Sequence, residues 1–109
     1  MPRLISRGRL TQEYAKRLAG APEDREPAVR KLIEASGGKL LNFYFTTGDA
    51  DYVVIAEGET EAVIAAMMAA AAAGMVCDVS TSRAWTGAEF KAVAEKAASV
   101  AGNYRPPGK

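Results

Sequence analysis

The sequence predicts an α+β fold built on a four-stranded antiparallel sheet, and three observations support it. Four segments are rich in aromatic and β-branched residues or alternate apolar with polar residues, as strands do. Segments with helical spacing separate the first strand from the second and the third from the fourth. Gly48, Asp49 and Ala50 join the middle two strands as a hairpin connection. A chain of 109 residues can bury roughly two thirds of its unfolded surface in one compact core.

The first strand and the turn after it are predicted at the start of the chain. Residues 3–10, RLISRGRL, form the strand, in which Gly8 indicates a bulge or the close approach of another group. Thr11 is a suitable N-cap for a short helix over residues 12–18, which Gly20 closes.

A longer helix is predicted before the second strand. If Asp24 caps this helix, Pro27 falls in the first turn, where its missing N–H is not needed. Gly37 and Gly38 end the helix. Its apolar residues recur at helical spacing: Val29, Leu32 and Ile33.

The second and third strands are predicted at residues 39–47 and 51–57. The third is apolar on both faces, as is typical of a strand inside a sheet. The second has one apolar face and one mixed face: Leu41, Phe43 and Phe45 on the first, and Asn42, Tyr44 and Thr46 on the second.

The last third of the chain predicts a helix, a strand and a final helix. The helix covers residues 61–73, is rich in alanine and almost free of charge, and is therefore expected to be covered on most sides. The strand follows at residues 75–85. Thr86 and Glu89 form a capping box that starts the final helix. One domain is thus expected over residues 1–101, with a flexible tail at 102–109.

This order of elements is that of the ferredoxin-like βαββαβ fold with an added C-terminal helix. In such a fold the helices cover one face of the sheet. We expect the other face to be apolar enough that a second copy must cover it, which predicts a homodimer or a multiple of dimers. The residues assigned to that uncovered face are Tyr44, Thr46, Tyr52 and Val54.

Three segments of the chain resemble the GYD-domain family of small bacterial proteins, over residues 1–98. They are MPRLISRGRLTQE, AVRKLIEASGGKLLNFYFTTGDADYVVIAE and STSRAWTGAEF. The family's Gly-x-Tyr-Asp signature corresponds to Gly48-Asp49-Ala50-Asp51, in which Ala50 stands where the tyrosine is expected. The resemblance implies a dimeric α/β barrel, and it implies no particular activity.

Composition excludes several kinds of chemistry. Histidine is absent and Cys77 is the only cysteine, which excludes Ser-His and Cys-His nucleophile pairs, sites with imidazole ligands and intrachain disulfides. We therefore expect no cofactor and no metal. A formal net charge of +1 predicts neither a nucleic-acid nor a membrane partner. With no long apolar span and a single thiol, a cytoplasmic location is expected.

The candidate site residues are Tyr44, Thr46, Asp51, Tyr52, Arg83 and Trp85, which could converge on a small organic ligand. The same aromatic residues could instead fill a dimer core. The leading hypothesis is an uncharacterised small dimeric protein that binds a ligand or a partner without demonstrated catalysis.

The alternative hypothesis is a cofactor-independent enzyme, monooxygenase-like or isomerase-like, acting on a small organic molecule. In that enzyme Asp51 acts as base, Tyr44 as donor and Arg83 as anion clamp. Asp51 can also shape the hairpin or pair with Arg83, and Asp49 is most simply a turn residue that bonds its own backbone.

Overall fold

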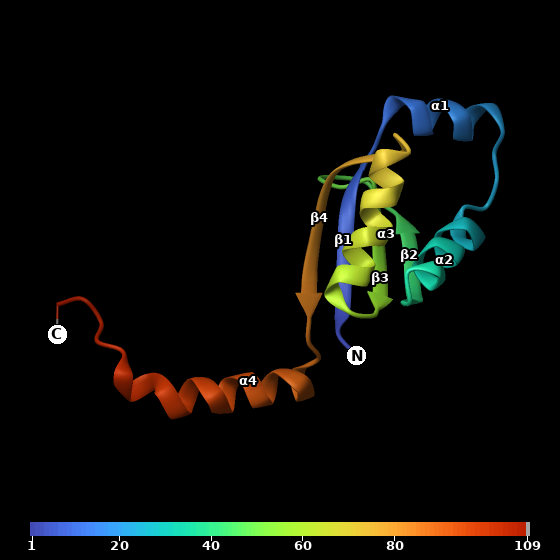
Figure 1. The fold of residues 1–109 in the computed structure, drawn as a ribbon. Coiled ribbons are helices and arrows are strands. Elements are labelled where there is room, and N and C mark those ends of the chain that lie inside the picture. The colour runs from blue at the N-terminus through green and yellow to red at the C-terminus, as the bar shows by residue number, and fades with distance from the viewer. Residues whose placement is uncertain (109) are drawn as a thin grey trace.

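A computed structural model describes residues 1–108 and confirms the α+β fold with a C-terminal helix (Figure 1). The sheet has four antiparallel strands in the order β2-β3-β1-β4. No helix of these residues is long and apolar enough to cross a membrane. In chain order the elements are β1 (Arg3–Leu10), α1 (Gln12–Gly20), α2 (Glu26–Ala35), β2 (Lys39–Phe45), β3 (Tyr52–Glu57), α3 (Thr60–Ala72), β4 (Val76–Ala84), α4 (Gly87–Val100) and a 3-10 turn (Ala101–Asn103).

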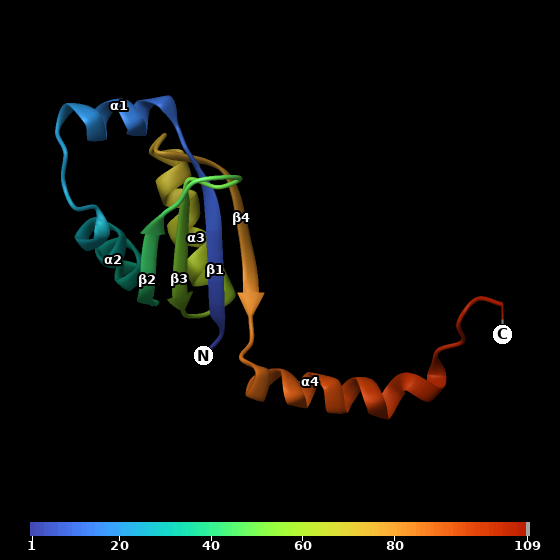
Figure 2. The ribbon, with the colours of Figure 1, turned by 180° about the vertical axis from the view of Figure 1, so that it is seen from behind.

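Helices α2 and α3 lie against one face of the sheet, and α1 lies across the end where β1 finishes (Figure 1). Seen from behind, the opposite face of the sheet is uncovered (Figure 2). The core lies between sheet and helices and is lined mainly by Leu4, Ile33, Leu40, Val54, Ala56, Val63 and Met67. The predicted single covered face is therefore confirmed.

The assignment of Tyr52 and Val54 to the uncovered face is wrong. Both side chains are 2% exposed and belong to the core beneath the helices. Strand β3 is apolar on both faces, so its sequence does not reveal which face points inward. The apolar residues on the uncovered face are instead Ile5 and Ile55, which pair across β1 and β3, and Val53 of β3, which pairs with Tyr44 of β2.

Helix α3 is less covered than its composition indicates. Val63, Ala66 and Met67 are buried, but Ile64 is 42% and Met68 is 67% exposed. The expectation that α3 is enclosed on most sides is therefore wrong within one chain, because α2 and the sheet contact only one side of it. An apolar strip on the outer side of α3, which includes Ile64 and Met68, is therefore left uncovered.

Glycine at position 8 allows a close approach, as the sequence indicates. A Cβ built there would lie 2.7 Å from Oη of Tyr52 and 2.9 Å from the carbonyl oxygen of Cys77. The register between β1 and β4 shifts between Arg7 and Arg9, and Asp78 opposite has a positive φ of 51°. Tyr52 therefore lies directly over the backbone of β1.

Two of the three expected helix caps are visible in the hydrogen bonds. Thr11 Oγ1 accepts from the backbone N–H of Tyr14 at 3.1 Å. The expected cap of α2 by Asp24 is wrong, because the N-cap is Arg25 and has no side-chain cap bond, while Oδ1 of Asp24, one residue earlier, accepts from the N–H of Glu26 at 3.0 Å. Thr86 and Glu89 form the complete capping box at the start of α4. Glu89 also accepts from Arg3 at 2.9 Å, which ties α4 to β1.

We expect the Glu89 carboxyl to titrate far below its usual range. The backbone N–H of Thr86, followed by the Arg3 guanidinium, lowers the pKa of Glu89 from 4.5 to about 2. Because the pKa is lowered on folding, this cap contributes fully above pH 4.5 and is lost as the pH falls toward 2. Carbon-13 NMR of the carboxyl measures it, and Arg3→Gln should raise the pKa only partly, because Thr86 contributes more. A wild-type pKa near 4.5 would contradict the capping geometry.

Candidate functional site

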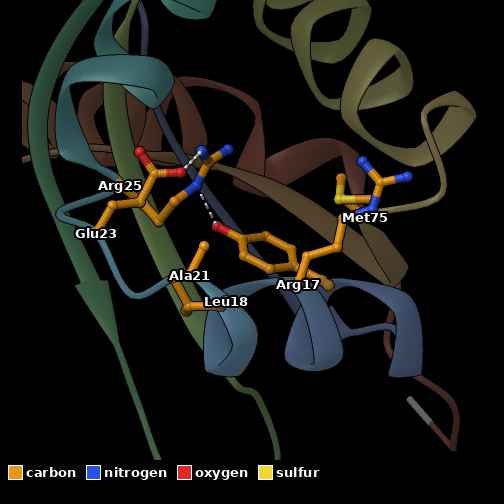
Figure 3. A pocket seen from close by; sticks show the side chains of 7 residues that line it. Arg17, Leu18, Ala21, Glu23, Arg25 and Met75 are labelled. Atoms are coloured by element: carbon orange, nitrogen blue, oxygen red, sulfur yellow. Dashed lines mark hydrogen bonds and ion pairs between the residues drawn. The ribbon is translucent and has the colours of Figure 1, made fainter.

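A cleft of about 250 Å³ opens between α1, the connection from α1 to α2, and the start of β4 (Figure 3). Its floor is the ring of Tyr14, which is 7% exposed. Nε of Arg25 donates a hydrogen bond to the Tyr14 hydroxyl at 3.1 Å, and Nη1 donates to Glu23 at 2.9 Å (Figure 3). The other lining residues are Arg17, Leu18, Ala21 and Met75.

The start of α1 positions Tyr14 in this cleft. The backbone N–H of Thr11 donates to the carbonyl of Met75 at 3.1 Å, and its hydroxyl donates to the carbonyl of Gly74 at 2.5 Å. These bonds hold α1 against the connection between α3 and β4, and the cap then directs Tyr14 inward one turn later. Arg25 comes from the other side of the cleft, at the N-cap of α2.

The cleft continues between α2 and α3 as a second space of about 270 Å³. Tyr14, Arg25 and Met75 border both spaces. The α3 side of the second space consists of the small side chains of Ala69, Ala70 and Ala73, which leave room where larger side chains would fill it. A small interior space of about 50 Å³ lies beyond, lined by apolar residues and again by Tyr14.

Arg25 supplies a fixed positive charge where the cleft meets the apolar space between α2 and α3. The hydrogen bond to Tyr14 raises the pKa of Arg25 above its ordinary value, while partial burial opposes that rise. The guanidinium carbon also lies 5.5 Å from the centre of the Tyr14 ring, within the range of a cation–π contact. The cation is thus held by a phenol and a carboxylate before any ligand arrives.

Tyr52 contributes a buried hydroxyl that lacks a partner among residues 1–108. Burial raises the pKa of Tyr52, and the Ser6 hydroxyl offsets this rise only in part. Ser6 Oγ itself accepts a hydrogen bond from Thr81 at 3.1 Å. Tyr52 therefore keeps its proton at neutral pH and has a donor to offer.

Asp51 is engaged in holding the hairpin to β1. Its Oδ2 accepts from the backbone N–H of Leu10 at 2.9 Å and lies 3.9 Å from Nε of Arg9. Its own N–H donates to the carbonyl of Gly8 at 2.7 Å. The ion-pair partner is thus Arg9, and the alternative pairing with Arg83 is not formed.

The remaining sequence candidates lie elsewhere. Thr46 donates to the carbonyl of Ala50 within the hairpin at 2.7 Å, and Tyr44 projects from the uncovered face with 54% of its surface exposed. The guanidinium of Arg83 lies 5.0 Å from the ring of Trp85, next to the base of α4. The six candidates are therefore spread over the hairpin, the uncovered face, the core and the start of α4, and they do not form one site.

Sequence reasoning missed the residues that do line the cleft, Tyr14, Arg25 and Met75. A signal was present for Tyr14, which is the one aromatic residue in α1 and lies a turn after a good N-cap. Arg25 had no comparable signal because it lies in a loop whose path depends on the packing of α1. Within residues 1–108, no group of three or more His, Cys, Asp or Glu side chains could hold a metal ion.

Comparison with known proteins gives one match. The model of the GYD domain matches residues 4–94, which extend from β1 into α4. No curated protein and no solved structure matches the chain.

Proposed function

The chain belongs to the GYD domain family, and we propose that it binds a small organic molecule with an apolar body and an acidic group. The proposal rests on one observation: Arg25 is fixed above Tyr14 where a polar cleft meets the apolar space between α2 and α3. Apolar walls with a few polar groups that fix orientation are the usual composition of small-molecule sites.

The chemistry of the cleft favours an acid over a neutral ligand. Nε and Nη1 of Arg25 are engaged, and no described residue accepts from Nη2, so this edge of the guanidinium is available to a carboxylate. Among the described residues that line the mouth, Glu23 is the one acid, and Arg17 also lies there, paired with Glu13 at 2.7 Å. The walls toward α3 are alanines, which suit an aliphatic or aromatic body.

The alternative, a cofactor-independent enzyme, has less support. Its base, donor and anion clamp would be Asp51, Tyr44 and Arg83, which lie in different parts of the structure. The Asp51 carboxylate is also used by the Leu10 N–H. Binding without catalysis therefore remains the leading proposal.

We also propose that two copies pack through the uncovered faces of their sheets. Ile5, Val53 and Ile55 form an apolar centre on that face, with Tyr44 beside them. Packing against a second copy removes this apolar surface from water, and identical surfaces pack about a two-fold axis.

We also propose a cytoplasmic location, because Cys77 is an exposed free thiol, which fits a reducing compartment.

Nuclear magnetic resonance with octanoate and phenylacetate tests the ligand proposal, with their primary amides as uncharged analogues. We expect both acids to shift the backbone signals of Tyr14, Arg25 and Met75. Arg25→Gln should weaken acid binding at least tenfold and leave amide binding unchanged. Arg30→Gln is the matched control, because Arg30 pairs with Glu26 on α2 away from the cleft.

A second variant tests the apolar wall. Ala69→Leu fills the space between α2 and α3 and should abolish binding of acid and amide alike, without loss of stability. Ala65→Leu, on an exposed position of α3 that lines none of these spaces, should bind as the wild type does. Failure of both acids to shift these signals at millimolar concentration, or equal effects of Arg25→Gln and Arg30→Gln, would contradict the proposal.

A further inference from the structure

Helix α4 leaves the domain and projects away from it in both views (Figures 1 and 2). It has no buried residue. The radius of gyration is 17.8 Å, against about 13 Å for a compact chain of this length. The accessible surface is 7387 Å², and a folded monomer of 11.5 kDa exposes about 5,800 Å². The excess is roughly twice the ~800 Å² that each partner buries in a standard stable interface.

One side of α4 is apolar along its whole length. We call this side the arm face, and it consists of Phe90, Val93, Ala94, Ala97, Val100 and Ala101. Phe90 is 48%, Val93 is 40% and Val100 is 46% exposed. Lys91, Glu95 and Ser99 lie on the opposite side, so α4 has the pattern of a helix that packs against another surface.

Contacts at the base of α4 prevent it from folding back on its own domain. Glu89 is held by the Thr86 backbone and by Arg3, and Phe90 packs edge-on against Trp85 at 5.8 Å. Only Trp85 and Thr86 separate β4 from α4, so a reversal of the helix would break these contacts. The surface that covers the arm face must therefore belong to another molecule.

The same chain offers a surface that suits the arm face. A groove of about 330 Å³ runs between the outer side of α3 and strand β4, and we call it the α3–β4 groove. It exists because β4 is the edge strand and no helix lies outside α3. None of its residues is charged: Ile64, Met67, Met68, Ala71, Val79 and Thr81.

We propose that α4 is an exchanged arm whose arm face lies in the α3–β4 groove of a second copy of this chain. The occupant is a second copy because the molecule exposes both an apolar helix and an apolar, uncharged groove, and its excess surface matches an interface of stable size. Each copy can donate one arm and receive one about a two-fold axis, in a contact separate from the packing of sheets proposed above.

Sedimentation velocity with a matched pair of variants tests the arm. Val93→Glu places a charge on the arm face and should weaken self-association at least tenfold. Ala92→Glu, one residue away on the polar side of α4, should leave the association constant within twofold of the wild type. A monomeric wild type at all concentrations, or equal effects of the two variants, would overturn the proposal.

The groove is tested in the same way. Met68→Glu should weaken association to the same degree as Val93→Glu, and the double variant should be no weaker than either single variant. Ala65→Glu, also exposed on α3 but outside the groove, is the control. An unchanged association constant in Met68→Glu would place the arm elsewhere and overturn the assignment of the groove.

Disulfide trapping distinguishes the remaining arrangements. In a Cys77→Ser background, chains carrying Val93→Cys are mixed with chains carrying Met68→Cys, and a covalent heterodimer is expected on oxidation. Homodimers of Val93→Cys alone would show that arms pair with arms. A disulfide within a single chain that carries both substitutions, at monomer mass, would show that the arm lies in its own groove. Either of these results overturns exchange between copies.

Discussion

Gly8→Ala is expected to lower the free energy of unfolding by about 2–3 kcal/mol, measured by urea denaturation. The added Cβ would lie 2.7 Å from the Tyr52 hydroxyl oxygen and 2.9 Å from the carbonyl oxygen of Cys77. The first contact is with a buried ring and the second with the backbone of the neighbouring strand, so neither moves freely. Because β1 is paired on both sides, the sheet itself must shift to admit the methyl group.

Three further variants identify which contact causes the loss of stability in Gly8→Ala. Gly87→Ala is the control, because a Cβ at the first residue of α4 has no other atom within 4 Å, and its stability should change by less than about 0.5 kcal/mol. Tyr52→Phe removes a buried hydroxyl that has no partner among residues 1–108 and should stabilise the protein by about 1 kcal/mol. In the double variant Gly8→Ala/Tyr52→Phe, about 1 kcal/mol of the loss should be recovered beyond additivity, since the nearest atom is gone. Strict additivity would show that the strain comes from the Cys77 carbonyl and the ring of residue 52 rather than from the Tyr52 hydroxyl.

Asp51→Ala is expected to lower the free energy of unfolding by about 1–2 kcal/mol, measured by the same denaturation. The substitution leaves the partly buried N–H of Leu10 without its acceptor and removes the weak ion pair with Arg9. Asp51→Asn keeps an oxygen acceptor and should lose about half as much. In Asp51→Ala, the bond from the residue 51 N–H to the Gly8 carbonyl and the bond from Arg9 to the Asp49 carbonyl would still hold the hairpin connection to β1.

Asp49→Ala is the matched control for Asp51. No hydrogen bond to the Asp49 carboxylate is found among the described residues, and its carbonyl, which accepts from Arg9 at 3.1 Å, survives the substitution. We expect a change below about 0.5 kcal/mol. Equal losses for Asp49→Ala and Asp51→Ala would contradict the structural role assigned to Asp51, and would leave the hairpin's own turn as the source of stability.

Much of the fold follows from local patterns. The capping box of Thr86 and Glu89, the N-cap of Thr11 and the turn glycines each act over a few residues, so the sequence shows where helices start and chains reverse. The order of elements followed from the same patterns, whereas the family was indicated by the resemblance of whole segments and is shown by the match over residues 4–94. Local patterns do not show which face of β3 is buried beneath the helices, because a strand that is apolar on both sides fits the sheet in either orientation.

The candidate site shows where sequence reasoning stops. Asp51 and Tyr52 stood out because carboxylates and aromatic residues next to a turn are common in functional sites, yet one holds the hairpin and the other lies in the core. Tyr14 and Arg25 meet only because α1 folds over the end of the sheet and brings residues eleven positions apart within 3.1 Å.

By itself, the sequence determined the α+β class, the element order, the caps at Thr11 and Thr86, and the close approach at Gly8. These depend on backbone geometry and on spacings of one to four residues. The tertiary structure alone decided which face of β3 is buried, which residues surround the cleft, and that α4 leaves its own domain. Those outcomes depend on how whole elements pack against one another, and that packing is set by shape and contact across the molecule rather than by neighbours in the chain.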